Sequence, residues 1–499
     1  MTWRRLSPRM LAVHPVQEAF RYLPVLVGVL FIGGRGQGHL WSLIGLGLAV
    51  AGGLLRWFTT TYQITPTHVR VRRGLLRRQE LSVPRDRVRS VDLTAHPMQR
   101  LLGLNRVVIG TGRADRGQEG VTLDALARAE AAALRGELLR RSPAVADVGT
   151  GAGIEGGGPI PATDAFAITT LVPSWIRFGP FTLSGIATIG VVAGSLANLF
   201  NESRVAPREF GLLRAVADQL ASVPAGVAVA EVAVATAVVV ALLSAIAYVL
   251  AFWNFRLTRQ NGTLHVARGL LTTRSTTIEL RRLRGAEISE PLLLRMVGGA
   301  RCLAITTGLR VGLGAEHGGS ILLPPAPLPE ARRVAGEVLG DSGPVTAALT
   351  RHGRRARRRR HVRAFAFAAL VTGFFVLMWW LFGWPAWQWQ ASCALFGIGA
   401  LLAEDRYRNL GHALVAGRLV FRGGGLVRRR HMLASEGVIG WTVRRSFFQR
   451  RAGLVTLTAT SAAGHQHYST VDIPVSEAIA LADAATPGLL TAFLRRPPS

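Results

Sequence analysis

Lysine is absent from this sequence, and cysteine is scarce. All 59 basic residues among the 499 are arginine, and with 29 acidic residues they give a net charge of +30. Two cysteines, Cys302 and Cys393, are too few for a disulfide framework and have no metal-binding spacing, so we expect both to be small buried residues. Exclusive use of Arg, with abundant Ala and Gly, is typical of GC-rich coding. An individual Arg is therefore weak evidence for a ligand contact.

Motifs of the common enzyme classes are also absent. The chain has no HExxH, GxSxG, Walker loop or paired CxxC. The glycine-rich segment 33–36 has no preceding strand and is expected to be a turn. His465-Gln466-His467 could place two imidazoles on one strand face, but it has no acidic or Cys partner nearby, and a hairpin tip is expected. We predict no enzymatic activity, no cofactor and no metal site.

Long apolar runs, which soluble proteins lack, are present in three pairs. The hydrophobic content of 49% and the mean hydropathy of +0.29 exceed those of an ordinary soluble protein. The simplest count is six transmembrane helices in three hairpins. The first run, of about 13 residues, is shorter than the ~20 that cross a bilayer, which leaves a tilted span, a longer span or a re-entrant segment as alternatives. The runs are Tyr22 to Gly34 with Leu40 to Phe58, Phe178 to Phe200 with Ala225 to Phe252, and Ala364 to Phe382 with Ala386 to Ala403.

Net positive charge lies on one side of these hairpins. It precedes and follows the first pair and precedes the third as the run 354–360, whereas the loop inside each pair has little net charge. The positive-inside rule therefore places both termini and the segments between hairpins in the cytoplasm. The basic amino terminus has no convincing cleavage site, and we expect it to be retained.

One stretch, Tyr62 to Gly112, occurs more than once, which changes the fold prediction. A shift of 195 positions places Gly74-Leu75-Leu76 on Gly269-Leu270-Leu271 and Arg100 on Arg295. A weaker third copy starts at Tyr407. Each copy follows an apolar pair.

Each copy reads as short strands closed by one helix. Apolar stretches rich in β-branched residues are broken by Gly and Pro, as antiparallel strands and turns are. Ala- and Leu-rich segments then begin at Asp124, Pro327 and Pro474 and predict a carboxy-terminal helix in each copy. We predict a small barrel or sandwich plugged by that helix.

The chain resembles a known family, the bacterial pleckstrin-homology-like (PH-like), membrane-flanked domain proteins, of the multi-copy type. The motifs that carry the resemblance are the opening Tyr62-Gln63-Ile64-Thr65 and its counterpart Phe255-Arg256-Leu257-Thr258, the Gly-Leu-Leu turn, the segment Arg100-Leu101-Leu102-Gly103-Leu104 and a terminal Thr-Gly. The third copy departs from them, opening with Tyr407-Arg408-Asn409. The resemblance implies PH-like β-barrels at the surface of a bacterial inner (plasma) membrane, with a poorly defined biochemical activity. Together with the apolar runs and the Arg distribution, it gives the predicted fold class: six transmembrane helices in three pairs, each pair followed by a cytoplasmic PH-like β-barrel with a C-terminal helix.

These observations divide the chain into eight segments. They are hairpin 1 (1–58), PH-like domain 1 (59–142), a Gly/Pro-rich linker (143–165), hairpin 2 (166–253), PH-like domain 2 (254–341), a basic juxtamembrane segment (342–363), hairpin 3 (364–404) and a divergent PH-like domain 3 (405–499).

Two groups of Arg are candidates for contact with lipid headgroups. In a PH-like barrel the loop between the first two strands commonly presents basic side chains to phosphate, and the resemblance places Arg72, Arg73, Arg77 and Arg78 there. The second copy has Thr272 and Thr273 in place of the last two. The second group is Arg357, Arg358, Arg359 and Arg360, a run with three interpretations: a topology signal, attraction to anionic headgroups, or nucleic-acid binding, which the lack of interleaved aromatics disfavours.

Two classes of function remain. The first is a non-catalytic membrane adaptor or scaffold in cell-envelope homeostasis, whose PH-like domains bind anionic lipid headgroups or a smaller single-domain membrane protein of the same family. The alternative is a transport or export component in which the transmembrane helices form a pathway. Glu231, near the start of the fourth apolar run, is the one acid that such a pathway could use, and we interpret it as an interfacial residue.

Overall fold

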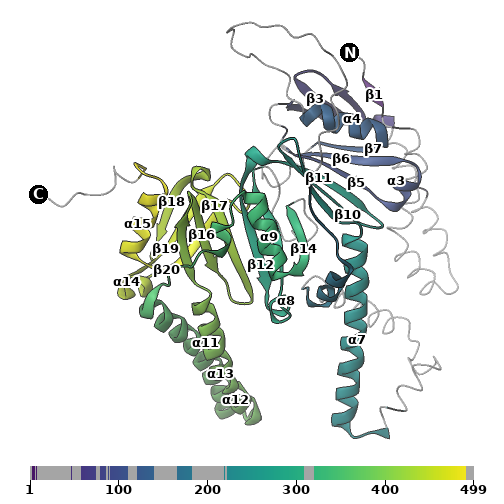
Figure 1. Cartoon of the computed structure of the whole chain (residues 1–499). Helices are drawn as coiled ribbons and strands as arrows, with labels where there is room; N and C mark the ends of the chain where they lie inside the picture. The colour runs from purple at the N-terminus through teal and green to yellow at the C-terminus, as the bar shows by residue number, and fades with distance from the viewer. Residues whose placement is uncertain are drawn as a thin grey trace, which may run out of the picture. The chain divides into compact units, whose positions relative to one another are not determined.

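The structure is a computed structural model of the whole chain (Figure 1). It describes residues 58–74, 79–85, 88, 90–110, 121–139, 166–182, 222–307 and 320–489, together with 3–5, 7, 47 and 219. The first hairpin, most of the first arm of the second hairpin and the linker 143–165 lie outside the described residues.

The three copies have one element order in common. Three strands come first, three more follow with a short helix after the fourth strand, and one helix closes the copy. The first copy comprises β2 (Thr61–Ile64), β3 (His68–Arg73), β4 (Gln79–Pro84), β5 (Ser90–Ala95), α3 (Pro97–Leu101), β6 (Leu104–Gly110), β7 (Val121–Ala127) and α4 (Arg128–Leu139). The second comprises β9 (Arg256–Gln260), β10 (Thr263–Arg268), β11 (Thr273–Glu279), β12 (Leu283–Pro291), α8 (Leu292–Met296), β13 (Gly299–Thr306), β14 (Ile321–Pro327) and α9 (Leu328–Leu339). The third comprises β15 (Gly411–Val415), β16 (Arg418–Gly423), β17 (Val427–Ala434), β18 (Val438–Arg444), α14 (Phe447–Ala452), β19 (Leu454–Ser461), β20 (His467–Pro474) and α15 (Val475–Ala485).

The predicted closing helices are present, with one change at a helix start. The first begins at Arg128 and not at Asp124, because Val121–Ala127 forms β7. Asp124 is held in that strand by an ion pair with Arg106 of β6. The other two begin one residue after the predicted proline, at Leu328 and Val475.

A glycine turn joins the second and third strands of every copy. Gly74, Gly269 and Gly424 have φ values of 100°, 107° and 105°, a conformation that L side chains rarely adopt. A Cβ at Gly424 would lie 1.9 Å from the carbonyl oxygen of Val427. The Gly-Leu-Leu turn was predicted between the first two strands. It lies one strand later, because residues 61–64 form a strand of their own.

The sheets run across the boundaries between copies, unlike the self-contained barrels expected from the sequence. The seven-stranded sheet has the order β7-β6-β5-β11-β10-β9-β8, where β8 is Phe166–Thr170, and the six-stranded sheet has the order β14-β13-β12-β17-β16-β15. In both, the fourth strand of one copy pairs antiparallel with the third strand of the next. We call β5–β11 the first junction and β12–β17 the second junction. Arg100 of α3 adds a bond at the first, donating to the Leu270 carbonyl at 2.8 Å.

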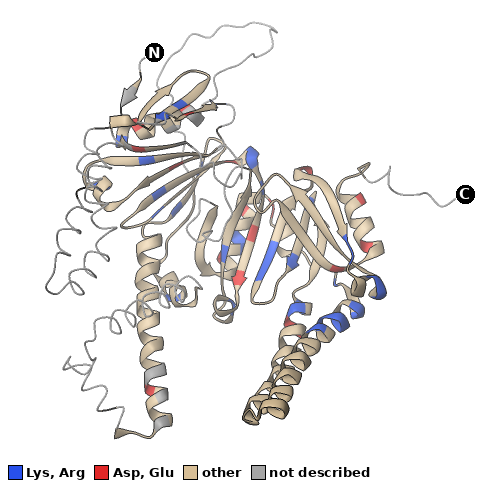
Figure 2. Ribbon diagram, turned by 180° about the vertical axis from the view of Figure 1, so that it is seen from behind, with Lys and Arg blue, Asp and Glu red and all other residues tan. Residues whose placement is uncertain are grey.

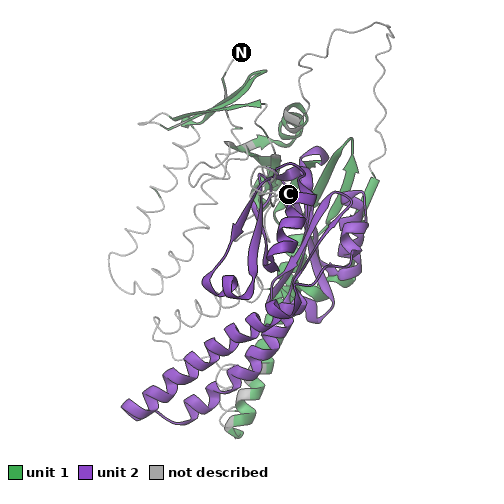
Figure 3. Ribbon diagram, turned by 90° about the vertical axis from the view of Figure 1, so that its left-hand side faces the viewer, with its two compact units in different colours: residues 1–279 green, residues 280–499 purple. Residues whose placement is uncertain are grey.

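Two further sheets contain the strands that remain. One has the order β1-β2-β3-β4, with β1 at Arg4–Arg5, and the other has the order β18-β19-β20. The chain divides into two compact units at the bond between Glu279 and Leu280, so the boundary falls between β11 and β12, inside the second copy (Figure 3).

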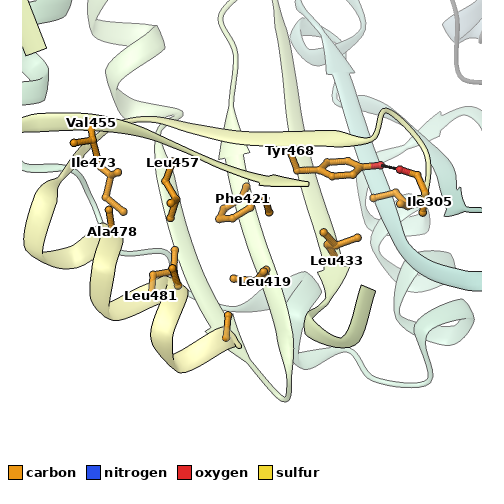
Figure 4. Packing of buried hydrophobic residues seen from close by; sticks show 14 residues of the cluster. Ile305, Leu419, Phe421, Leu433, Val455, Leu457, Tyr468, Ile473, Ala478 and Leu481 are labelled. Atoms are coloured by element: carbon orange, nitrogen blue, oxygen red, sulfur yellow. Dashed lines mark hydrogen bonds between the residues drawn. The ribbon is translucent and has the colours of Figure 1, made fainter. Parts of the chain in front are cut away.

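Each unit has its own apolar core. In the first unit, Tyr62, Val69 and Val91 belong to a cluster that joins β2, β3 and β5 to β6, β7 and α4. In the second unit, Phe421 and Leu457 pack with α15, and Ile305 from the second copy joins them (Figure 4). The hydroxyl of the buried Tyr468 donates to the carbonyl of Ala463 at 3.2 Å, which satisfies its polar end (Figure 4).

Among the described residues, two helices are long and apolar enough to cross a membrane. They are α7 (Ala225–Phe252), through Val234–Phe252, and α11 (Gly353–Phe382). The described residues therefore support two of the six predicted spans. The run predicted to begin at Phe178 instead starts inside a 3-10 helix, η2 (Pro173–Phe181), where Gly179 lies against Tyr248 of α7.

The third hairpin is present in full. Its return arm is α12 (Trp387–Ser392) followed by α13 (Ala394–Arg408), with a break at Cys393. An ideal Cβ at Gly399 of α13 would lie 3.5 Å from the Cβ of Ala364, so the two arms pack closely. The run of Arg forms the first turns of α11 itself, and a short helix, α10 (Gly343–Thr346), precedes it. Cys302 is buried as expected, whereas Cys393 is exposed.

Candidate functional site

The third copy contains a cavity of about 420 Å³. Its walls come from the start of α11, the end of α13, β16, β17, β20 and the glycine turn between β16 and β17. The lining residues are Arg360, Arg406, Leu410, Phe421, Arg422, Gly423, Gly424, Gly425, Val427, Arg429, His431, Ser469, Thr470 and Val471.

Arginine dominates the charge of this cavity. Four Arg from four different elements line it, and no Asp or Glu is among the lining residues. Figure 2 shows Arg gathered at the end of the α11–α13 pair that meets the strands of the third copy. The lining residues therefore give the cavity a positive charge.

Three of the four Arg, namely Arg360, Arg422 and Arg429, have partners on the protein side, and Arg429 pairs with Glu287. The Nε of Arg360 lies 3.0 Å from Oδ2 of Asp472, a fully buried residue of β20 that also pairs with Arg359. Gln449 of α14 donates to the same carboxylate at 3.0 Å. Arg422 donates to two main-chain carbonyls, of Arg408 at 3.1 Å and Asn409 at 3.3 Å. Arg422 is thus positioned without losing its charge to an acid.

Arg406 depends on the glycine turn for its place. A Cβ at Gly425 would lie 2.7 Å from the Nε of Arg406, so a larger residue at 425 would displace this guanidinium. The glycine turn that all copies share therefore has a second role in the third copy, where it leaves space for the side chain of Arg406.

Positive charges are close enough together to oppose one another. Burial lowers the pKa of Arg422, and the neighbouring Arg428 lowers it further. Burial, followed by the charge of Arg422, lowers the pKa of Arg430 to about 10. An anion in the cavity would relieve the repulsion at Arg422.

An acidic cluster lies behind one side of the cavity, at the second junction. Glu287 of β12 is 4% exposed. Its carboxylate lies 3.4 Å from Arg429 Nε, 3.4 Å from His431 Nδ1 and 3.5 Å from His465 Nε2. Burial alone would raise the pKa of Glu287, but His431, His465 and Arg429 together hold it well below its usual value.

The first junction has an acid at the same repeat position. Asp92 of β5 lies opposite Thr276 of β11, as Glu287 lies opposite His431 of β17. Burial raises the pKa of Asp92, and a hydrogen bond from Thr276 and the charge of Arg274 oppose that shift only in part. Neither acid was predicted as a site residue. The 195-residue shift that aligns the copies places Asp92 on Glu287 and could have revealed them.

The candidate Arg of the third hairpin separate into several environments. Arg357 donates to Glu404 of α13 at 2.9 Å, and Arg358 is exposed on α11. Arg359 and Arg360 converge on Asp472, and only Arg360 also lines the cavity. Sequence reasoning did not single out the other three cavity Arg, because they come from elements distant in the chain.

The candidate Arg of the first copy lie around the β3–β4 turn. Arg72 pairs with Glu80 across β3 and β4 at 3.0 Å, and its guanidinium lies 4.0 Å from the ring centroid of Trp3. Arg73 ends β3. Arg77 and Arg78 lie outside the described residues. The ligand role of these four side chains remains a prediction.

His465-Gln466-His467 lies at a hairpin tip, as predicted. Gln466 has a left-handed φ of 64° between β19 and β20, and its carbonyl accepts from the Ser461 amide. Over the part of the chain that the structure describes, no group of three or more His, Cys, Asp or Glu could hold a metal ion.

Comparison with known proteins identifies the repeat. A family model described as bacterial PH domain matches residues 19–142, 212–341 and 360–486. The chain belongs to this family. The three matches confirm the predicted multi-copy arrangement of bacterial PH domains, each spanning one set of strands and its closing helix. No curated protein and no solved structure matches the chain.

Within this bacterial PH protein, the described cavity lies in the copy whose sequence departs most from the other two. Its Arg422 and Arg429 stand on either side of the glycine turn.

Proposed function

We propose that this chain is a non-catalytic membrane adaptor whose third PH domain binds an anionic, phosphate-bearing headgroup in the cavity lined by Arg360, Arg406, Arg422 and Arg429. The observation that carries the proposal is that four Arg line one cavity and no acid is among its lining residues. Arg suits this role because its planar fork of donors matches phosphate oxygens.

The size of the cavity and its elements support a lipid as the source of the phosphate. About 420 Å³ is within the range of small-molecule sites. Two of the four Arg, Arg360 and Arg406, belong to α11 and α13, the two arms of the third hairpin. A headgroup at the membrane surface would therefore meet the cavity from the side of the hairpin. Exposed Arg358 could add attraction to an anionic surface.

The experiment compares lipid and free phosphate on the intact detergent-solubilised protein. The probes are short-chain phosphatidylglycerol, short-chain phosphatidylcholine and inorganic phosphate. We expect binding of phosphatidylglycerol that weakens with salt and little binding of phosphatidylcholine. Arg406→Gln with Arg422→Gln should weaken it about 30-fold, since each Arg near an anionic group contributes ~1 kcal/mol.

A matched control removes the same charge elsewhere. Arg444→Gln with Arg450→Gln changes two exposed Arg outside the cavity lining and should leave binding within about twofold of the parent protein. An equal loss of binding in both double variants would show that binding depends only on net charge, and would refute the cavity as the binding site. Equal binding of inorganic phosphate would assign the site to a soluble anion.

The remaining parts of the function are also proposals. Domains 1 to 3 and both termini are cytoplasmic in a bacterial inner membrane, and reporter fusions at Gly151, Asp341 and Ser499 should all read cytoplasmic.

A smaller single-domain membrane protein of the family is the proposed partner in envelope homeostasis, and its absence from crosslinked complexes in native membranes would refute it. The first-copy Arg are a second proposed headgroup site, to be tested by changing all four to Gln in the same binding assay. For the alternative, a transport pathway, Glu231→Gln should abolish transport without lowering protein level.

A further inference from the structure

The two junctions follow one pairing rule. In each, the third strand of a copy pairs with the fourth strand of the preceding copy. The register is also the same: Arg274 lies opposite Thr94 in the first junction, and Arg429, which occupies the repeat position of Arg274, lies opposite Ser289, which occupies that of Thr94. Two independent junctions with one register indicate a property of the repeat.

Three copies leave one third strand and one fourth strand without such a partner. Among the described residues, β4 pairs only with β3, and β18 pairs only with β19. The first is the third strand of the first copy, and the second is the fourth strand of the last copy. They are the two kinds of edge that join in the junctions.

Burial separates these edges from their counterparts. Ile288 of β12 is 2% exposed, whereas Val443, at the same position of β18, is 54% exposed. Thr276 of β11 is 7% exposed, whereas Leu81, at the same position of β4, is 39% exposed. Both edges present apolar side chains to solvent at positions that the junctions cover, and such edges are templates for strand pairing.

Charge also distinguishes the two edge strands, β18 and β4, from the paired strands of the junctions. Each junction has an acid on the fourth strand and an Arg on the third, Asp92 with Arg274 and Glu287 with Arg429. At these positions β18 has Thr442 and β4 has Gln79. The acid and the Arg are missing together. Pairing β18 with β4 involves neither of these two charges, whereas pairing either edge with a strand of the charged type would leave one of them without its partner.

We propose that β18 of one chain pairs with β4 of a second copy of this chain, in the register of the two junctions. The register places Gln79 opposite Arg444, Glu80 opposite Val443 and Leu81 opposite Thr442. The exposed Arg445 then lies diagonal to Glu80, where opposite charges attract across strands. The interaction is strand addition, in which main-chain hydrogen bonds supply affinity and side chains set register.

This contact is heterologous, because two different edges meet. Each chain that uses β18 leaves its own β4 free for the next chain, so the contact makes closed rings or open rows of chains. All partners lie side by side in one membrane, which favours the contact through a high local concentration.

The test is thiol crosslinking of the full chain in membranes. Two differently tagged versions, both with Cys302→Ala and Cys393→Ala, are co-expressed, one with Glu80→Cys and the other with Val443→Cys. A short thiol-to-thiol crosslinker should join the two tags in one product. Since the cysteines are on separate chains, the product can form only between copies. Cβ atoms of directly opposite residues lie ≈4.5–5.5 Å apart, within reach of the reagent.

Two controls set the scale. Ser275→Cys with Leu93→Cys places the thiols at the same register position of the first junction and should link within one chain. Glu80→Cys with Thr442→Cys is one residue out of register and puts the thiols on opposite faces, so its yield should be at least several-fold lower. The proposal is overturned if the Ser275/Leu93 pair links but the two tags are never joined. It is equally overturned if in-register and out-of-register pairs link alike, or if Glu80→Cys and Val443→Cys link only when both are in one chain.

Discussion

The two junctions place an acid at the same point and treat it in opposite ways. Asp92 interacts with the hydroxyl of Thr276 and the guanidinium of Arg274. Its pKa is raised because the effect of burial is larger than the effect of these two groups. Glu287 has two imidazoles and a guanidinium within 3.5 Å, and its pKa is lowered although it is buried. One repeat position thus holds an acid whose pKa is raised in the first unit and an acid whose pKa is lowered in the second.

The difference comes from two residues of the third copy. His431 replaces the Thr276 of the second copy, and His465 comes from the β19–β20 hairpin tip. The two junctions have the same backbone register, so a few side chains determine the difference in pKa between the two acids. Predictions that separate the junctions test this interpretation directly.

Neutralising the two acids should have the largest effect. Glu287→Gln keeps the side-chain shape but leaves a guanidinium and two imidazoles without their anion, and it should destabilise the second junction by about 2–3 kcal/mol. Asp92→Asn removes a charge that burial already disfavours, and it should change the first junction by less than about 1 kcal/mol. Hydrogen exchange of β12 and β17, compared with β5 and β11, measures both. Equal losses of protection would show that the two sites do not differ.

The junctions should also respond to pH with opposite signs. The lowered pKa of Glu287 means that its contribution is complete above the ordinary value of 4.5 and is lost as pH falls below it. The raised pKa of Asp92 means that a penalty applies at higher pH and disappears as pH falls through the raised value. As pH falls from about 5 to about 3, exchange protection at β12–β17 should fall while that at β5–β11 holds or rises. Parallel loss at both junctions would contradict the assignment.

The smallest expected effect is that of adding the charge pair of the junctions to the inferred contact between β18 and β4. Thr442→Glu gives β18 the acid of the other fourth strands, and alone it should slow the Glu80→Cys/Val443→Cys crosslink severalfold. Adding Gln79→Arg on the partner copy, together with Arg444→Ser on β18 so that two Arg do not face each other, restores an opposite-charge pair worth roughly 0.2–1 kcal/mol and should recover the rate. If the crosslinking rate does not recover, residues 79 and 442 are not neighbours across the inferred contact.

Local structure was predictable from the sequence, because it depends on near neighbours. The strand and turn pattern, the glycine positions Gly74, Gly269 and Gly424, and the three closing helices were all evident. The error at Asp124 arose because an Ala-rich segment suits a helix, while pairing with β6 holds its first residues in a strand.

Strand partners were not predictable in the same way. The third strands of all copies suit a fourth strand of their own copy or of a neighbour, and nothing in one strand specifies which. The cavity was missed for a similar reason, since Arg360 and Arg429 come from elements far apart in sequence. The acids at the junctions are the exception, because the 195-residue shift by itself aligns Asp92 with Glu287.

The crossing of sheets between copies has a consequence during synthesis. Arg100 binds the carbonyl of Leu270, 170 residues further along the chain. At ~5–20 residues per second, the ribosome takes roughly 10–30 s to reach Leu270 after it has passed Arg100. Throughout this interval the edge of β5 lacks its partner strand β11. The nascent first copy is thus exposed to wrong strand partners for a time set by translation.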